Sequence, residues 1–259
     1  MTSTKKDAVP ESEMSIMSHL SELRMRLIRS AIAIVVGVIV VWAFFKEIFG
    51  VLEEPYCDYK EGLGQECDFL LTTITEAFST VLSLSGWGGL VLATPVILYQ
   101  LARFIMPGLY PDERKVLAIF IPISVGLMFT GMATGYFLMP KAVEVLLSFG
   151  DIESFDAQLS PKAYVAFFVK MLLAFGVSFQ LPVVLVFLQK VGLVKPETLR
   201  SNRRYAIVMV VAAGAVITPT GDPFTLAVIS IPMYLFYELS ILVGTRIKTR
   251  SIKSGDPAT

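Results

Sequence analysis

The stretch LIRSAIAIVVGVIVVWAFF, residues 27–45, carries one charge, on Arg29, and is otherwise almost wholly apolar. A helix needs about 20 consecutive apolar residues to cross roughly 30 Å of hydrocarbon, and this stretch comes close to that length. Five later stretches are similarly apolar: residues 77–101, 116–139, 163–189, 205–218 and 223–243. None shows the alternation of a β-barrel strand, and only helices satisfy their own amides in lipid. The sequence therefore predicts an all-α integral membrane protein with six transmembrane helices.

The composition agrees, because 54% of the residues are hydrophobic and only 17% are charged. The fifth stretch is the exception in length, since residues 205–218 cover only about 21 Å at 1.5 Å per residue. We therefore expect the fifth and sixth helices to form a short hairpin closed by residues 218–223. Either the bilayer thins around this hairpin or the hairpin sits low in the membrane, and the sequence leaves both open.

Basic residues fix the expected orientation. Most of the 22 Lys and Arg residues fall in four segments that share one side of the six-helix threading: Lys5, Lys6, Arg24, Arg26 and Arg29; Arg103, Arg114 and Lys115; Lys190, Lys195, Arg200, Arg203 and Arg204; Arg246, Lys248, Arg250 and Lys253. Only Lys46, Lys60, Lys141, Lys162 and Lys170 remain elsewhere. The asymmetry predicts that both termini are cytoplasmic.

The polarity of the two ends predicts the domain organisation. Residues 1–13 are expected to be a flexible cytoplasmic N-terminus, residues 14–244 a single membrane domain and residues 245–259 a cytoplasmic tail. No cleavable signal sequence is recognisable, since the first residues are polar and the first apolar run is long. Absence of a transit peptide favours the plasma membrane of a prokaryote. A nucleic-acid partner has no support.

Both cysteines, Cys57 and Cys67, lie in the first outer loop, which would face an oxidising compartment. We expect them to form a disulfide, with two free thiols as the alternative.

Residues for catalysis are scarce. The single histidine, His19, rules out a Ser–His dyad at membrane depth, and neither cysteine is spaced against a histidine for zinc. No GxxxxGK[ST] motif is present, so ATP is not expected to be a direct energy source. We expect a protein that is not an enzyme and that needs no metal or cofactor.

Strongly polar side chains at membrane depth are the next candidates, because each is costly there and usually faces a partner or a wet cavity. They are Lys170, whose stem can extend back toward the outer boundary, Gln180 and Glu238, with Glu76 at the outer mouth of the second stretch. Glu238 is either a proton site or an interfacial carboxylate paired with a basic neighbour. A proton-coupled small-solute transporter is the second hypothesis, although such proteins usually show more midplane polarity and an internal repeat.

Two inner segments place acids on an otherwise basic face. Residues 19–29 form an amphipathic lead-in, expected to lie along the inner surface, in which Glu22 is four residues from Arg26. The link between the second and third stretches, residues 104–115, contains prolines and a glycine that predict an ordered cap around Glu113. Carboxylates on such a face can select a cationic peptide by bidentate pairing with guanidinium, although Glu22 can also pair with Arg26 alone and Glu113 can simply balance its basic neighbours.

The lead-in HLSELRMRL, residues 19–27, resembles that of the TatC family, the receptor of the twin-arginine protein export system. The resemblance extends in order from about residue 17 to residue 244. Its other segments are Pro55, TPVILYQ at 94–100, the cap at 104–114, FGVSFQLP at 175–182, the Thr218-Pro219 turn leading to Asp222, and IPMY at 231–234.

This resemblance implies a concave, glove-like bundle that binds twin-arginine signal peptides of folded cargo on its cytoplasmic face. Residues at the matching positions contact the arginine pair or shape that surface: Glu22, Glu113, Arg24, Arg26, Phe104 and Leu109. Pro55 and Asp222 match positions of the outer cap. The implied partners are small single-span Tat subunits of the TatA and TatB type, docked beside the fifth and sixth helices, and other copies of the chain. Transport in that family is driven by the proton-motive force.

Two positions depart from the family pattern. Gln180 stands where many members carry glutamate, which removes a charge from the concave side; we expect it to bond a polar residue of a partner helix. Leu226 stands where some members have glutamine, so a polar contact there cannot be carried over.

Overall fold

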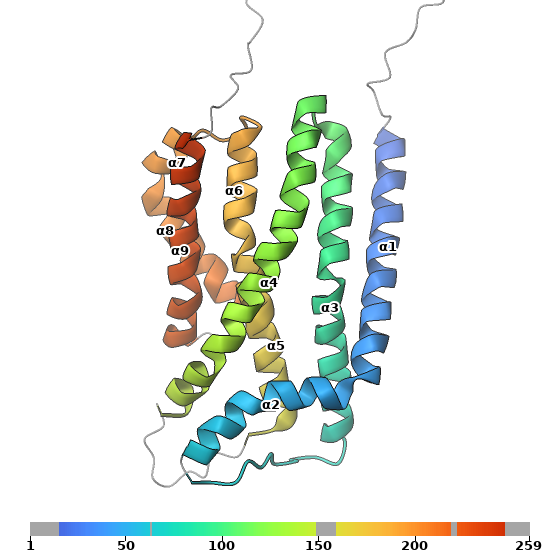
Figure 1. The fold of residues 1–259 in the computed structure, drawn as a ribbon, viewed down its shortest axis with the longest axis vertical. Coiled ribbons are helices and arrows are strands. Elements are labelled where there is room, and N and C mark those ends of the chain that lie inside the picture. The colour runs from blue at the N-terminus through green and yellow to red at the C-terminus, as the bar shows by residue number, and fades with distance from the viewer. Residues whose placement is uncertain (1–15, 63, 149–158, 219–221, 247–259) are drawn as a thin grey trace, which may run out of the picture.

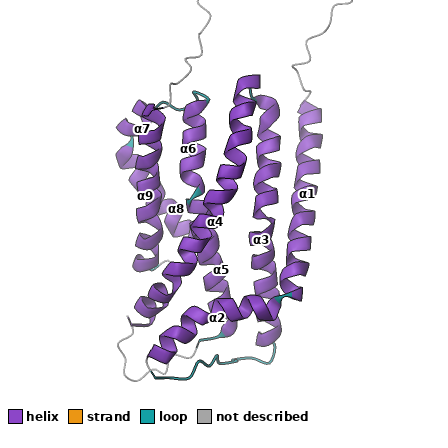
Figure 2. Cartoon of the chain, viewed as in Figure 1, coloured by secondary structure: helices purple, strands orange, loops and turns teal. Residues whose placement is uncertain are grey.

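The computed structural model describes residues 16–62, 64–148, 159–218 and 222–246, and every regular element within these ranges is helical (Figure 2). The predicted N-terminus 1–13, most of the predicted tail 245–259 and the centre of the turn at 218–223 lie outside the described residues. In Figure 1, α2 crosses one end of the bundle, and the first turn of α1 and the last turn of α9 lie at the opposite end. We call these the α2 end and the site end.

The first helix, α1, runs from Ile16 to Ala43 without interruption. The prediction that the lead-in lies along a surface is therefore wrong: residues 16–26 continue the axis of the spanning helix (Figure 1). The physical reason is that no proline or glycine occurs between Ile16, where the helix begins, and Gly37, so nothing breaks the hydrogen-bond ladder where the polar part meets the apolar part.

Helix α3, Glu76–Ile105, packs antiparallel beside α1 (Figure 1). Their closest approach is between two glycines. A Cβ added to Gly37 would lie 2.5 Å from the Gly89 carbonyl oxygen, and one added to Gly89 would lie 2.5 Å from the Val38 amide nitrogen. Small residues of this kind let two membrane helices come into backbone contact, where dispersion forces are strongest.

The segment expected to be an outer loop contains a further helix, α2, Phe45–Gly62. The sequence did not predict this helix because its composition is too polar for a spanning segment. Only one face is buried, on which Leu52, Pro55 and Tyr56 point toward the bundle. Partial burial also raises the pKa of Glu53 on this helix by desolvation.

Three proline-containing helices follow. Helix α4, Pro111–Ser148, is tilted across the bundle in Figure 1 and extends beyond the predicted stretch 116–139 at both ends. The predicted fourth helix is divided into α5, Pro161–Ser178, and α6, Gln180–Lys190, with a break at Phe179. The break follows from Pro182, which has no N–H to donate to the Ser178 carbonyl one turn earlier.

The last elements are α7, Pro196–Ser201, α8, Arg203–Ile217, and α9, Pro223–Arg246. Five helical segments within the described ranges are long and apolar enough to cross a membrane: Met17–Ala43, Glu76–Gly108, Glu113–Ser148, Pro161–Lys190 and Pro223–Arg246. The predicted fifth span corresponds to α8, whose 15 residues cover only about 22 Å. The prediction of six spans is thus confirmed for five helices, and α8 has the short length that the sequence predicts.

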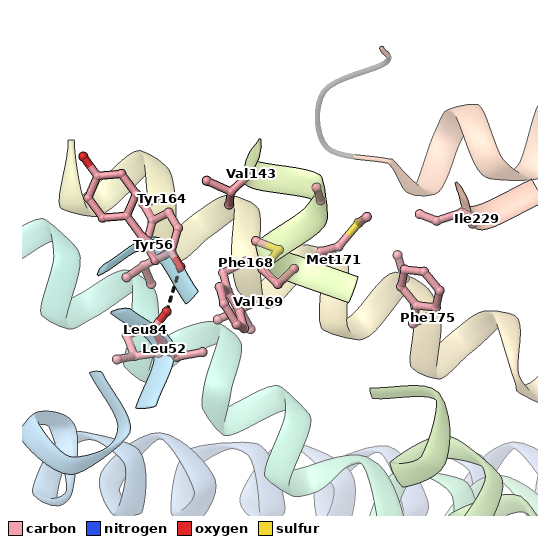
Figure 3. Close-up of a cluster of buried hydrophobic side chains, with 14 of the residues drawn as sticks. Leu52, Tyr56, Leu84, Val143, Tyr164, Phe168, Val169, Met171, Phe175 and Ile229 are labelled. Atoms are coloured by element: carbon pink, nitrogen blue, oxygen red, sulfur yellow. Dashed lines mark hydrogen bonds between the residues drawn. The ribbon is translucent and has the colours of Figure 1, made fainter. Parts of the chain in front are cut away.

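The core lies around α5, toward the α2 end. Figure 3 shows Leu52 and Tyr56 of α2 beside Tyr164 and Phe168 of α5, with Phe175 further along the same helix. Tyr56, Phe168 and Phe175 are fully buried, and the Tyr164 hydroxyl donates to the Leu52 carbonyl at 2.8 Å. Helix α5 is thus the central element on which α2, α3, α4 and α9 pack.

Candidate functional site

The candidate site lies where α1 begins, α3 ends and α4 begins. The chain turns from α3 to α4 through a short 3-10 helix, η1, Met106–Gly108, so the cap predicted between them is ordered (Figure 1). Pro107 and Pro111 supply backbone angles suited to the start of each helical piece. All six residues expected to shape a binding surface therefore lie at the site end.

A carboxylate in this region already holds a guanidinium. Arg26 donates from Nε (3.1 Å) and from Nη2 to Oε1 of Glu22, one turn earlier on α1. Its Nη1 also reaches Oε1 of Gln100 on α3 at 3.5 Å. The Glu22 and Arg26 side chains are 23% and 14% exposed, so water screens this pair only in part. The arrangement links α1 to α3 through one arginine.

The aromatic contact between α1 and α3 is equally direct. The His19 and Phe104 rings stack with centroids 4.4 Å apart and planes 16° from parallel. The stacking holds the half-buried Phe104 ring on the last turn of α3 against α1. His19 and Gln100 are residues that the sequence did not identify as site residues, although both lie in the segments that carry the family resemblance.

The cap orders the second acid by a different route. Glu113 Oε2 accepts the Tyr110 backbone N–H at 2.9 Å, which caps the start of α4. Arg114 Nε donates to the Leu109 carbonyl at 3.0 Å and so fixes Leu109 at the turn. The expectation that Glu113 only balances its basic neighbours gains no support, since its carboxylate accepts a hydrogen bond from the Tyr110 backbone amide.

The structure gathers the candidate residues into two groups. Glu22, Arg26 and Phe104 share the contact between α1 and α3, whereas Leu109 and Glu113 belong to the cap. Among the described residues the two carboxylates share no hydrogen-bonding partner. Arg24 is exposed on α1, two residues after Glu22. Within the same ranges no cluster of three or more His, Cys, Asp or Glu side chains is placed to hold a metal.

The α2 end has its own arrangement. Pro55 lies inside α2 and lacks the N–H that would bond to the Val51 carbonyl, and the Tyr136 hydroxyl of α4 donates to that carbonyl at 3.1 Å. Cys57 and Cys67 are joined in a disulfide with Cα atoms 5.0 Å apart.

Asp222 caps α9 in this structure. Its Oδ1 accepts the Thr225 N–H at 2.7 Å, and Pro223 occupies the first helical position, a pairing typical of helix starts. The predicted role of Asp222 in the outer cap stays a prediction.

Glu76 organises the α2 end, whereas the sequence identified it only as a polar residue at the outer mouth of the second span. One carboxylate oxygen accepts the Thr72 N–H (2.5 Å), the Thr72 hydroxyl (2.6 Å) and the Thr73 N–H (3.2 Å). The other accepts the hydroxyl of Ser160, which itself caps α5 by accepting the Ala163 N–H. The sequence signal was the T-x-x-E pattern at 73–76, which is that of a capping box.

Replacing Glu76 by glutamine should lower the thermal unfolding temperature and speed hydrogen exchange at residues 72–75. The amide keeps one acceptor oxygen but turns a donor toward groups that are already donors, so at least one hydrogen bond is lost. Glu66→Gln, an exposed acid of the same loop, is the control and should leave both measurements unchanged. Equal behaviour of the two variants would contradict the bracing role of Glu76.

Two of the polar residues at membrane depth, Gln180 and Glu238, have hydrogen-bonding partners within the chain. Gln180 Nε2 donates to the Ser124 carbonyl at 3.0 Å, and its Oε1 accepts the Ser124 hydroxyl, which ties α6 to α4. A contact between Gln180 and a partner helix therefore stays a prediction and is not needed to satisfy the amide. Glu238 accepts from Arg203 Nη2 at 2.6 Å and from the Tyr234 hydroxyl at 2.9 Å. Of the two roles considered for Glu238, the geometry favours the paired interfacial carboxylate.

Comparison with known proteins supplies the family. Residues 18–232 match the family model described as Sec-independent protein translocase protein (TatC). A protein of that name from Desulforapulum autotrophicum is 37% identical over 238 residues, covering 92% of this chain and 86% of the relative. One from Aquifex aeolicus is 38% identical over 245 residues, covering 93% and 98%. A crystal structure described as the twin arginine translocase receptor TatC superposes with a TM-score of 0.76 at 36% identity, covering 88% of this chain and 99% of that one.

Proposed function

Because the chain belongs to the TatC family of twin-arginine translocase receptors, we propose that its site end binds twin-arginine signal peptides, with Glu22 and Glu113 contacting the arginine pair. The chain is a non-enzymatic component of this protein transport system, and the chemistry is recognition. The observation that carries the proposal is that Glu22 already binds the guanidinium of Arg26 through two nitrogens. An incoming arginine offers the same group.

The second acid supports a paired contact. Glu113 has a carboxylate whose Oε2 is held by a backbone amide, which leaves Oε1 for a ligand. Phe104 and Leu109 flank the two acids, and Arg24 with its basic neighbours repels cations that lack the pairing geometry. Arginine is preferred to lysine in such a site because its planar fork matches a carboxylate bidentately.

The proposed topology has six spans, counting α8, with both termini in the cytoplasm and a single membrane domain over residues 14–244. Three features support it: the basic residues concentrate at one side, the beginning of α1 and the end of α9 lie at the same end of the bundle (Figure 1), and the disulfide lies at the other. The short α8 would be accommodated by local bilayer thinning. The chain is a multi-pass protein of a bacterial family, and we place it in the plasma membrane.

The proposed partners are the single-span subunits of the TatA and TatB type, further copies of this chain and membrane lipid. The exposed apolar side chains of α8, among them Val208 and Met209, offer such helices a surface beside α9. Energy would come from the proton-motive force, with no cofactor. In this scheme Gln180 contributes a polar group to the partner surface in addition to its bonds to Ser124.

The test of the proposed function is the affinity of the purified protein for a twin-arginine signal peptide and for its twin-lysine version. We expect the arginine peptide to bind at least about tenfold more tightly, which corresponds to roughly 1.4 kcal/mol for the lost bidentate geometry. The measurement is fluorescence anisotropy with labelled peptides at fixed ionic strength. Equal affinities would refute arginine recognition.

Replacing Arg26 by glutamine should strengthen peptide binding, because the peptide no longer competes with an internal guanidinium for Glu22. An expected gain of about fivefold corresponds to a pair worth about 1 kcal/mol. Arg29→Gln removes the same charge from an exposed position on α1 and serves as the control in the same anisotropy assay. A weaker complex in Arg26→Gln alone would mean that Arg26 contacts the peptide directly.

A further inference from the structure

Lys170 places a positive charge inside a membrane-spanning segment, Pro161–Lys190. Its Nζ lies 5.6 Å from the centre of the Trp87 ring on α3, and no carboxylate of the described residues forms an ion pair with it. The ring supplies only part of the counter-charge that a cation in hydrocarbon requires. Since the ammonium lies against Trp87, it does not simply extend along α5 toward the outer boundary.

The ammonium borders an open hollow of about 440 Å³. Leu173, Ala174 and Val177 of α5 form one wall, and Val216 and Thr218 at the end of α8 form another. The Thr218 hydroxyl makes one long hydrogen bond, 3.4 Å to the Ala215 carbonyl, and can exchange it for a better acceptor. The hollow thus has apolar walls with one cation and one hydroxyl.

The depth of the hollow indicates what enters it. Lys170 lies nine residues, about 13.5 Å, along α5 from Pro161. Helix α8 ends at the same hollow, and its roughly 22 Å length is well short of about 30 Å of hydrocarbon. A helix that ends early draws the polar boundary of the membrane toward its end. Lipid headgroups on the α2 side therefore come down to the level of Lys170, and tryptophan and lysine are the usual side chains at such a boundary.

We propose that this hollow is a binding site for the headgroup of an anionic phospholipid. The phosphate is held by the Lys170 ammonium and the Thr218 hydroxyl, and an acyl chain lies against the apolar wall of Leu173, Val177 and Val216. A bound lipid would neutralise the half-buried charge of Lys170 and fill the space beyond the end of the short helix α8. The site is separate from the site end and does not depend on the proposed peptide recognition.

The test uses Trp87 as a reporter. The chain has two tryptophans, so Trp42→Phe leaves Trp87 as the only one. The full chain is placed in phosphatidylcholine nanodiscs containing a minor fraction of brominated lipid, either phosphatidylglycerol or phosphatidylcholine. Bromine quenches on contact, so we expect brominated phosphatidylglycerol to quench Trp87 more strongly than the same fraction of brominated phosphatidylcholine.

The variants assign the preference to Lys170. Lys170→Gln should reduce the ratio of the two quenching constants to about one, whereas Lys170→Arg should retain it. Lys162→Gln, an exposed lysine on the same helix, is the matched control and should behave as the parent. The ratio cancels any change in intrinsic Trp87 fluorescence, and added inorganic phosphate should not lower it if the ligand is a lipid.

Three outcomes would overturn the proposal. Equal quenching by the two lipids in the parent would show that Lys170 does not select an anionic lipid, and its counter-charge would then be a carboxylate on a partner helix. A preference that persists in Lys170→Gln would place the lipid elsewhere, and a preference abolished by inorganic phosphate would assign the site to a free anion.

Discussion

Gly89→Ala is expected to destabilise the protein by roughly 1–3 kcal/mol, the cost of forcing a methyl group into a close-packed contact. The added carbon would lie 2.5 Å from the Val38 amide nitrogen, a backbone atom that cannot rotate away. Helices α1 and α3 would have to separate along their length. Because α1 carries Glu22 and α3 carries Phe104 and Gln100, peptide affinity should fall as well. Thermal unfolding in mild detergent, followed by size-exclusion chromatography, measures the first effect.

Gly86→Ala is the control for this prediction. It lies on the same helix three residues earlier, and a Cβ there meets no atom within 4 Å. Alanine is a better helix former than glycine by about 1 kcal/mol, so the control should be neutral or slightly more stable. If both variants unfold at the parental temperature, the glycine contact is not what holds α1 against α3.

Glu113→Gln is expected to weaken binding of a twin-arginine peptide by roughly tenfold to a hundredfold, since a hydrogen bond to a charged group is worth about 1.5–3 kcal/mol. Glutamine keeps an oxygen for the Tyr110 N–H, so the cap remains and only the charge is lost. Glu22→Gln should also weaken peptide binding, but by a smaller factor. In the parent, Arg26 already competes with the peptide for Glu22, so less binding energy is lost when the Glu22 charge is removed. The double variant should bind twin-arginine and twin-lysine peptides alike.

The control for the charge is Glu197→Gln, an exposed acid in the first turn of α7 on the same side of the proposed membrane topology. Removing it changes the net charge by the same amount but should leave the affinity within about twofold, as expected for a screened surface charge. Parental affinity in both Glu22→Gln and Glu113→Gln would place the arginine site elsewhere.

Hydropathy predicted the spanning helices well because membrane insertion depends on a local property of each segment. Where the fold depends on contacts between distant segments, the sequence was less informative. Helix α2 was expected to be a loop, since residues 45–62 are too polar to span and include Pro55; its order comes from contacts of Leu52 and Tyr56 with α5. The break at Phe179 could have been predicted from Pro182.

At the candidate site, too, residues within short sequence motifs could be predicted and contacts between distant segments could not. Glu22 and Glu113 were identified first as acids on an otherwise basic face and then from the family resemblance, and both signals lie within short contiguous segments. Gln100 could not be assigned as a partner of Arg26, because the two residues are 74 positions apart and meet only when α1 packs on α3. The error in placing the lead-in along a surface arose because amphipathic periodicity does not determine whether a helix bends where it enters the membrane.

The bond between Cys57 and Cys67 closes part of the chain into a covalent ring. Glu61, exposed at the end of α2, lies within that ring. A glutamate-specific protease that cuts there would open the backbone without releasing either portion, and the two would separate on a gel only after reduction. If a protease confined to one side of the membrane makes this cut, the two portions appear on a reducing gel, and their appearance shows on which side of the membrane the ring lies.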